Sequence, residues 1–179
     1  MYIESRYDRG IKDTLAQVKA LPSPEVGETV FCKENGRVLT FDGDLWMCDD
    51  FIKLTNGSTS TQLQGATMVI PFVSGAGGTV LPASNSYDTR VVGVCAYTTL
   101  GGAPMAIAYK GIYLVKLVYF STPTATGQFI RTTSAGGGGC SEINSSMVGG
   151  VYGWTLEVPT ASSPSLVRCL LRGKVEYYF

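Results

Sequence analysis

Apolar and polar residues alternate along most of this chain with a period of two, which is typical of β-strands. The alternation begins at Thr29 and continues, with short Gly- and Ser-rich interruptions, to the end of the sequence. It predicts a main body of strands at residues 67–73, 90–97, 105–110, 112–120, 127–132, 147–156, 166–171 and 174–179. We therefore expect a mainly β protein.

The pattern of the body occurs twice. Residues 69–78, 92–97 and 105–115 have counterparts of similar pattern at residues 129–138, 148–152 and 166–176. Gly111 and Gly173 interrupt corresponding runs, so we expect them to mark equivalent bends. Two copies are fewer than a solenoid needs, so the duplicated β-unit should complete one barrel or sandwich.

The first part of the chain differs from the body. Helical spacing predicts one N-terminal helix over residues 5–21, which Pro22 would end. A hairpin signal at Asn35-Gly36 and a turn at Asp42-Gly43 then predict a small three-stranded meander. Its strands would lie at residues 29–33, 37–41 and 45–48.

A short helix and a small meander are both only marginally stable in isolation, so their apolar residues must pack against another part of this chain or against a partner. We expect an interaction surface that holds the protein to a partner or to sister subunits, made of Tyr7, Ile11, Leu15, Val18, Trp46 and Phe51. The alternative is that the helix folds back on the chain's own barrel.

Charge changes sign near Lys53. Residues 1–53 carry ten acidic and seven basic side chains, whereas residues 54–179 carry four acidic and seven basic ones. We therefore divide the chain into an N-terminal attachment unit (1–53), a Ser/Thr-rich linker (54–66) and the β-body (67–179). The total net charge is zero, which favours neither nucleic acid nor an anionic membrane as a partner.

The composition argues against most enzyme chemistry. The sequence has no histidine, the commonest general base and metal ligand, and its five cysteines form no Cys-x-x-Cys pair. Asp42, Asp44, Asp49 and Asp50 could form a glycosidase pair or a calcium site, but aspartates are common at turns. The Gly-rich loops at 74–78 and 134–139 lack the Gly-Lys-Ser/Thr of a phosphate-binding loop. We expect no enzyme activity, cofactor or metal.

Several segments together resemble a known group of proteins. They are Val92-Gly93-Val94 and residues 103–115, 125–130, 148–151 and 166–173, and their order is similar to that in small β-rich proteins of tailed bacteriophages. Those proteins, encoded beside the head genes, act as capsid decoration, cement or head-fibre proteins. Residues 36–46 are similar to short meanders of phage fibre and tail proteins.

The resemblance implies a non-enzymatic structural protein that attaches to a phage capsid. Its partners would be the major capsid protein or other virion proteins, and it would form a homo-oligomer, with a trimer favoured by analogy. No segment is long and apolar enough to cross a bilayer and the start lacks the order of a secretory signal, so we expect assembly into virions in the bacterial cytoplasm. A tail-fibre or baseplate protein that binds host glycans is the alternative, and a carboxylate-dependent glycosidase is a more distant one.

Overall fold

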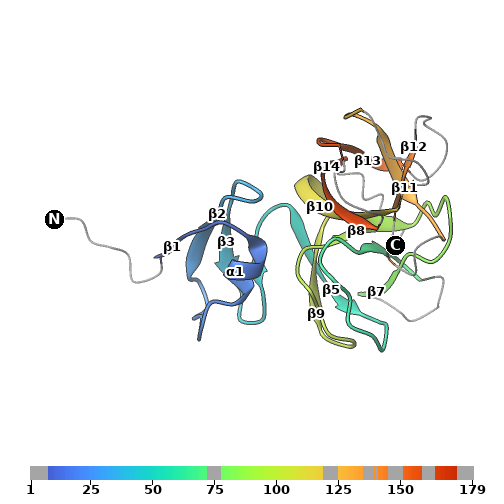
Figure 1. Cartoon of the computed structure of the whole chain (residues 1–179). Coiled ribbons are helices and arrows are strands. Elements are labelled where there is room, and N and C mark those ends of the chain that lie inside the picture. The colour runs from blue at the N-terminus through green and yellow to red at the C-terminus, as the bar shows by residue number, and fades with distance from the viewer. Residues whose placement is uncertain are drawn as a thin grey trace.

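The structure is a computed structural model that describes residues 8–71, 78–118, 125–134, 139, 141–144, 151–158 and 164–172. The protein is mainly β, as expected, and these ranges contain fourteen strands and one short helix (Figure 1). A small N-terminal sheet lies to one side of two closed β-barrels. Within the described ranges, no helix has the length and apolar character that a bilayer span requires.

The N-terminal sheet has four strands in the order β1-β2-β3-β4. They are β1 (Asp8–Lys12), β2 (Thr29–Cys32), β3 (Arg37–Phe41) and β4 (Trp46–Met47). The expected meander forms β2, β3 and β4, which pair antiparallel. The additional strand β1 pairs parallel with β2, so the sheet is larger than the meander alone.

The helix expected over residues 5–21 is wrong in extent. Helix α1 covers only Leu15–Lys19, and the residues before it form β1. The helix begins at Thr14, whose side chain accepts a hydrogen bond from the Gln17 N–H, while the Gln17 side chain accepts one from the Thr14 N–H. Gly10, with a φ of +73°, has a left-handed conformation that no α-helix can include.

Helix α1 covers one face of the N-terminal sheet. Its buried side chains, Leu15 and Val18, belong to the same apolar cluster as Val30, Cys32 and Leu39 of the sheet. In Figure 1, α1 lies in front of the sheet, where it contacts β1 and β2. The helix is therefore stabilised by packing on its own sheet, because five residues are too few to form a stable helix alone.

The first barrel has the closed order β5-β7-β6-β8-β9. Its strands are β5 (Phe51–Asn56), β6 (Thr67–Val69), β7 (Thr79–Pro82), β8 (Val91–Cys95) and β9 (Pro104–Ala108). The barrel closes because β5 pairs antiparallel with the last strand, β9, and parallel with β7. Since β5 continues to Asn56, the first residues assigned to a linker are part of the barrel.

The second barrel has the closed order β10-β12-β11-β13-β14. Its strands are β10 (Lys110–Val118), β11 (Phe129–Thr132), β12 (Ser141–Asn144), β13 (Val151–Thr155) and β14 (Ser165–Arg172). Strand β10 pairs antiparallel with β14 and parallel with β12, as β5 does with β9 and β7. Both barrels therefore have the same strand order and directions.

The expectation of one barrel shared by both halves is wrong, because each half closes on itself. The repeat in the sequence predicts that residues 110–115 belong to the first copy, but β10 opens the second barrel immediately after β9, with only Tyr109 between them. The apolar run through Gly111 therefore supplies β9 to the first barrel and β10 to the second. Gly173, its expected counterpart, lies outside the described residues.

Two glycines show which residues correspond in the two barrels. Gly93 is the third residue of β8 and Gly153 the third of β13. A Cβ atom on Gly93 would lie 2.1 Å from the Ala108 carbonyl oxygen, and one on Gly153 would lie 2.5 Å from that of Leu170. At both positions the absence of a side chain lets the strand approach the last strand of its own barrel closely.

Hydrogen bonds join the barrels to each other. The hydroxyl groups of Thr67, Ser141 and Tyr152 form a triangle with O···O distances of 2.6 to 2.8 Å, and Thr67 belongs to the first barrel while the others belong to the second. The Lys116 N–H also donates to the Gly65 carbonyl at 2.9 Å. Arg131 packs over the Tyr87 ring, 4.1 Å from its centroid.

Replacing either crowded glycine should test the close approach of the strands. We expect Gly93→Ala and Gly153→Ala each to lower the free energy of unfolding by about 3 kcal/mol, because the added methyl group meets backbone that cannot rotate away. Urea denaturation measures this change. Gly102→Ala is the control: its Cβ meets no atom within 4 Å, so only its φ of +74° should cost about 1 kcal/mol. Equal losses at all three positions would contradict the steric explanation.

Candidate functional site

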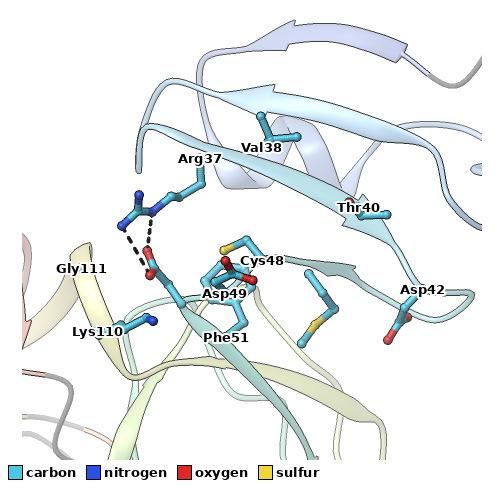
Figure 2. Close-up of a pocket in the computed structure, with 11 residues that line it drawn as sticks. Arg37, Val38, Thr40, Asp42, Cys48, Asp49, Phe51, Lys110 and Gly111 are labelled. Carbon is cyan, nitrogen blue, oxygen red and sulfur yellow. Dashed lines mark hydrogen bonds and ion pairs between the residues drawn. The ribbon is translucent and has the colours of Figure 1, made fainter. Parts of the chain in front are cut away.

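An open groove of about 980 Å³ lies where the N-terminal sheet meets the barrels. Figure 2 shows β3 along one wall, with Val38 and Thr40 on it, and Phe51, Lys110 and Gly111 on the opposite side. The groove is lined by Arg37, Val38, Thr40, Asp42, Met47, Cys48, Asp49, Asp50, Phe51, Lys110 and Gly111. Its walls thus come from the N-terminal sheet and from the first strand of each barrel.

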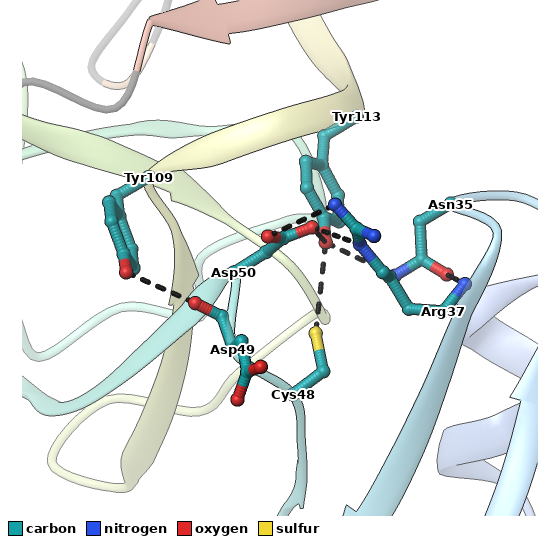
Figure 3. Close-up of polar contacts among 7 residues, drawn as sticks. All are labelled: Asn35, Arg37, Cys48, Asp49, Asp50, Tyr109 and Tyr113. Atoms are coloured by element: carbon teal, nitrogen blue, oxygen red, sulfur yellow. Dashed lines mark hydrogen bonds and ion pairs between the residues drawn. The ribbon is translucent and has the colours of Figure 1, made fainter.

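Asp50 is the central polar residue of this junction. Its side chain is only 2% exposed and forms an ion pair with Arg37, whose Nε lies 2.7 Å from Asp50 Oδ2. The Tyr113 hydroxyl of the second barrel donates to the same carboxylate oxygen at 3.2 Å. Hydrogen bonding to Asp50 raises the pKa of the Arg37 guanidinium. One carboxylate therefore links the N-terminal sheet to the second barrel (Figure 3).

Tyr113 connects this carboxylate to two further residues. The Asn35 amide donates to its hydroxyl oxygen at 3.2 Å, and the Cys48 sulfur lies 3.9 Å away. Burial raises the pKa of the Tyr113 phenol far above its usual value, so the phenol stays protonated. Gly111 also belongs to this cluster, because a Cβ there would lie 2.7 Å from Asp50 Oδ2.

Of the four aspartates considered as a catalytic or metal site, Asp42 and Asp44 share the partner Lys53, whereas Asp50 pairs with Arg37. Asp42 accepts hydrogen bonds from the Asp44 and Leu45 N–H groups and thereby shapes the turn before β4. Partial burial would raise the Asp42 pKa, but these bonds and Lys53 outweigh it, so the pKa is lowered. Lys53 lies 3.0 Å from Asp42 and 2.6 Å from Asp44. Among the residues that the structure describes, no three acidic or cysteine side chains are grouped to hold a metal ion.

The thiols are unsuited to nucleophilic chemistry. Burial raises the pKa of Cys95 to about 11 and that of Cys169 to about 12, and it also raises the pKa of Cys32 and Cys48. A thiol must lose its proton to act as a nucleophile, so the raised pKa values disfavour a catalytic role for any of the four. Cys140 and most of the two Gly-rich loops lie outside the described residues.

The residues expected to form an attachment surface are mostly buried. Leu15 and Val18 pack under the N-terminal sheet, and Trp46 and Phe51 lie in the core between the sheet and the barrels. The Tyr97 hydroxyl donates to the Trp46 carbonyl at 2.9 Å, and the Phe51 ring packs against Tyr97 and Tyr113. These four side chains therefore hold this chain together and offer no surface to a partner.

The two remaining members of that set have different positions. Ile11 lies on β1 and is 61% exposed, so it alone of the described members remains available for contact. Tyr7 lies outside the described residues.

Sequence reasoning missed Arg37, Tyr113 and Asn35 as members of the site. Asp50 was noticed only as one of four nearby aspartates, although its position directly before the Phe51 strand separates it from the turn aspartates. The only other signal was Gly111, which interrupts a long apolar run and is expected from the sequence to mark a bend.

The comparisons with known proteins add no assignment: no model of a protein family matches the sequence, and no curated protein matches it significantly. Any proposed function must therefore rest on the chemistry of the site itself. Its carboxylate, guanidinium and phenol groups satisfy one another, which suits a structural junction beside an open groove more than a reaction centre.

The ion pair at the junction should contribute measurably to stability. Arg37→Met removes the charge that compensates the buried Asp50, and we expect the free energy of unfolding to fall by about 2 kcal/mol. This is less than for a fully buried pair, because the Arg37 side chain is half exposed. Arg37→Met combined with Asp50→Asn should recover part of the loss, since no buried charge then remains unpaired.

The matched control is Lys33→Met. Lys33 pairs with Asp13 at 2.9 Å, but both side chains are more than half exposed, so we expect a change within about 0.5 kcal/mol. Urea denaturation of the four proteins provides the comparison, and equal effects of Arg37→Met and Lys33→Met would contradict the role assigned to Asp50.

The rate at which each cysteine is modified should fall as its burial increases. Of the four described cysteines, Cys48 alone is partly exposed, so iodoacetamide at pH 8 should label it before Cys32, Cys95 and Cys169 in the native protein. Peptide mapping by mass spectrometry measures the order, and urea-unfolded protein provides the fully labelled control. Native labelling of Cys95 or Cys169 as fast as that of Cys48 would contradict the structure.

Proposed function

We propose that the protein is a non-catalytic structural component of a tailed-phage virion, attached to the capsid as a decoration or head-fibre protein. The resemblance of residues 67–173 to phage decoration proteins supports this proposal. The mainly β fold with closed barrels is compatible with it.

The observation that carries the proposal is how the protein uses its buried charges. Four charged side chains are buried in the described ranges, namely Glu28, Asp50, Asp88 and Arg131. Each has an ion-pair partner, with N···O distances between 2.5 and 2.8 Å. Catalytic sites commonly hold ionisable groups ready to change state, whereas these groups are fixed by partners. Such an arrangement favours a structural role.

We also propose that the two barrels derive from one duplicated unit. The identical strand order supports this, as do Gly93 and Gly153 at equivalent positions and register shifts after Met68 and Ile130. A duplicated barrel lengthens a protein without requiring a new fold, which suits a protein that projects from a surface.

A tail-fibre or baseplate protein that binds host glycans is a second proposal. The observation that favours it is the open groove at the junction, where the exposed carboxylate of Asp49 and the ammonium group of Lys110 could contact sugar hydroxyl groups. Phe51, the aromatic residue of the groove, is only 6% exposed and cannot provide a stacking surface for a sugar ring. The decoration role is therefore the stronger proposal.

Virion stoichiometry tests these two roles. Particles purified from cells that express the gene should contain this chain, and quantitative mass spectrometry should give its ratio to the major capsid protein. We expect a ratio of the same order as that of the capsid protein for a decoration protein. A few copies per particle would favour the fibre or baseplate role, and complete absence from purified particles would contradict both.

A further inference from the structure

Three exposed apolar side chains form a row across the face of the N-terminal sheet opposite α1, and the row ends at Val38 on the wall of the groove. Ile11 lies opposite Phe31, and Phe31 lies opposite Val38, so the row crosses β1, β2 and β3. These side chains are 61%, 37% and 58% exposed, whereas the helix-covered face of the same sheet is buried. We call Ile11, Phe31 and Val38 the N-terminal row.

A second apolar row crosses the outside of the second barrel. Ile112 lies opposite Leu170, Leu170 opposite Trp154, and Trp154 opposite Phe129, on β10, β14, β13 and β11. Ile112 and Leu170 are about two-fifths exposed, and the Trp154 and Phe129 rings, 6.3 Å apart, are half-buried. We call these four residues the barrel row.

Basic side chains flank the barrel row. Arg168 and Arg172 alternate with Leu170 on the outer side of β14, and Lys110 lies directly opposite Arg172. Like charges at opposite positions on neighbouring strands are unfavourable. Among the described residues, Lys110, Arg168 and Arg172 have no ion-pair partner, so a partner that supplies negative charge here would be stabilising.

The two rows lie on units of opposite net charge. Residues 8–50, before the first barrel, carry nine acidic and five basic side chains, a net charge of −4, and residues 110–172 carry five basic and two acidic ones, a net charge of +3. None of the ion pairs within the described ranges joins these two parts of one chain. The charge difference is therefore available to act between molecules.

We infer that the protein self-associates head to tail, with the N-terminal row of one copy docked on the barrel row of a second copy. Pairing two N-terminal units would bring two net charges of −4 together, and pairing two barrel rows would oppose Lys110, Arg168 and Arg172 with themselves. Only the head-to-tail arrangement joins apolar surface to apolar surface and opposite charge to opposite charge. Trp154 and the two arginines are of the types that commonly dominate binding energy.

This contact is heterologous, so repeating it either closes a ring or extends a filament. The inference rests on the two surfaces and does not depend on the proposed virion role. A closed ring of three would agree with the trimer that the resemblance implies.

Complementation of two variants tests the arrangement. Phe31→Ser damages the N-terminal row and Leu170→Ser damages the barrel row. In sedimentation velocity over roughly 1 to 300 µM protein at low salt, we expect the wild type to assemble and each variant alone to have at least about tenfold weaker self-association. An equimolar mixture of the variants should form a 1:1 dimer, because the Phe31→Ser copy keeps an intact barrel row and the Leu170→Ser copy an intact N-terminal row.

Two further proteins separate docking from damage to the fold. Leu100→Ser changes a side chain that is 68% exposed and belongs to neither row, so it should assemble like the wild type. Arg168→Glu combined with Arg172→Glu changes only exposed side chains and should weaken assembly, as should about 0.5 M NaCl. A monomeric wild type, a mixture that remains monomeric, or an equal loss with Leu100→Ser would overturn the inference.

Discussion

The arrangement of the whole molecule depends on one buried carboxylate. Asp50 lies directly before the first strand of the first barrel and accepts hydrogen bonds from Arg37 of the N-terminal sheet and Tyr113 of the second barrel, and its carboxylate occupies the space that a side chain at Gly111 would need. Its backbone carbonyl also accepts a hydrogen bond from Tyr109, the residue between the barrels. Because a buried carboxylate is stable only when its oxygens are satisfied, these partners must all be in place together.

The local features of the N-terminal unit could be predicted from sequence, and its long-range ones could not. The meander was predicted correctly because its hairpin signals lie within a few residues of the strands that they join. Ile11, Leu15 and Val18 have helical spacing, yet Ile11 lies on a strand that pairs with Phe31. That pairing is non-local and parallel, so no periodicity within residues 5–21 could indicate it.

The barrels and the site were likewise predictable only as far as local sequence patterns indicate them. The repeated pattern predicted two similar β-units, but whether they shared one barrel depended on the parallel pairing of each first strand with its third, which joins segments far apart in sequence. Asp50 resembled its neighbour aspartates until the fold placed Arg37 and Tyr113 beside it. The interaction residues Trp46 and Phe51 were identified as apolar, but apolarity alone did not show that this chain buries them itself.

The shared core around the junction also determines how the protein can unfold. One continuous apolar cluster includes Leu15 of α1, Val94 of the first barrel and Val115 of the second. No unit can separate from the others without exposing part of that cluster to water and leaving Asp50 unpaired. Although the chain consists of a sheet and two barrels, it should therefore lose structure in one cooperative transition, as single domains do.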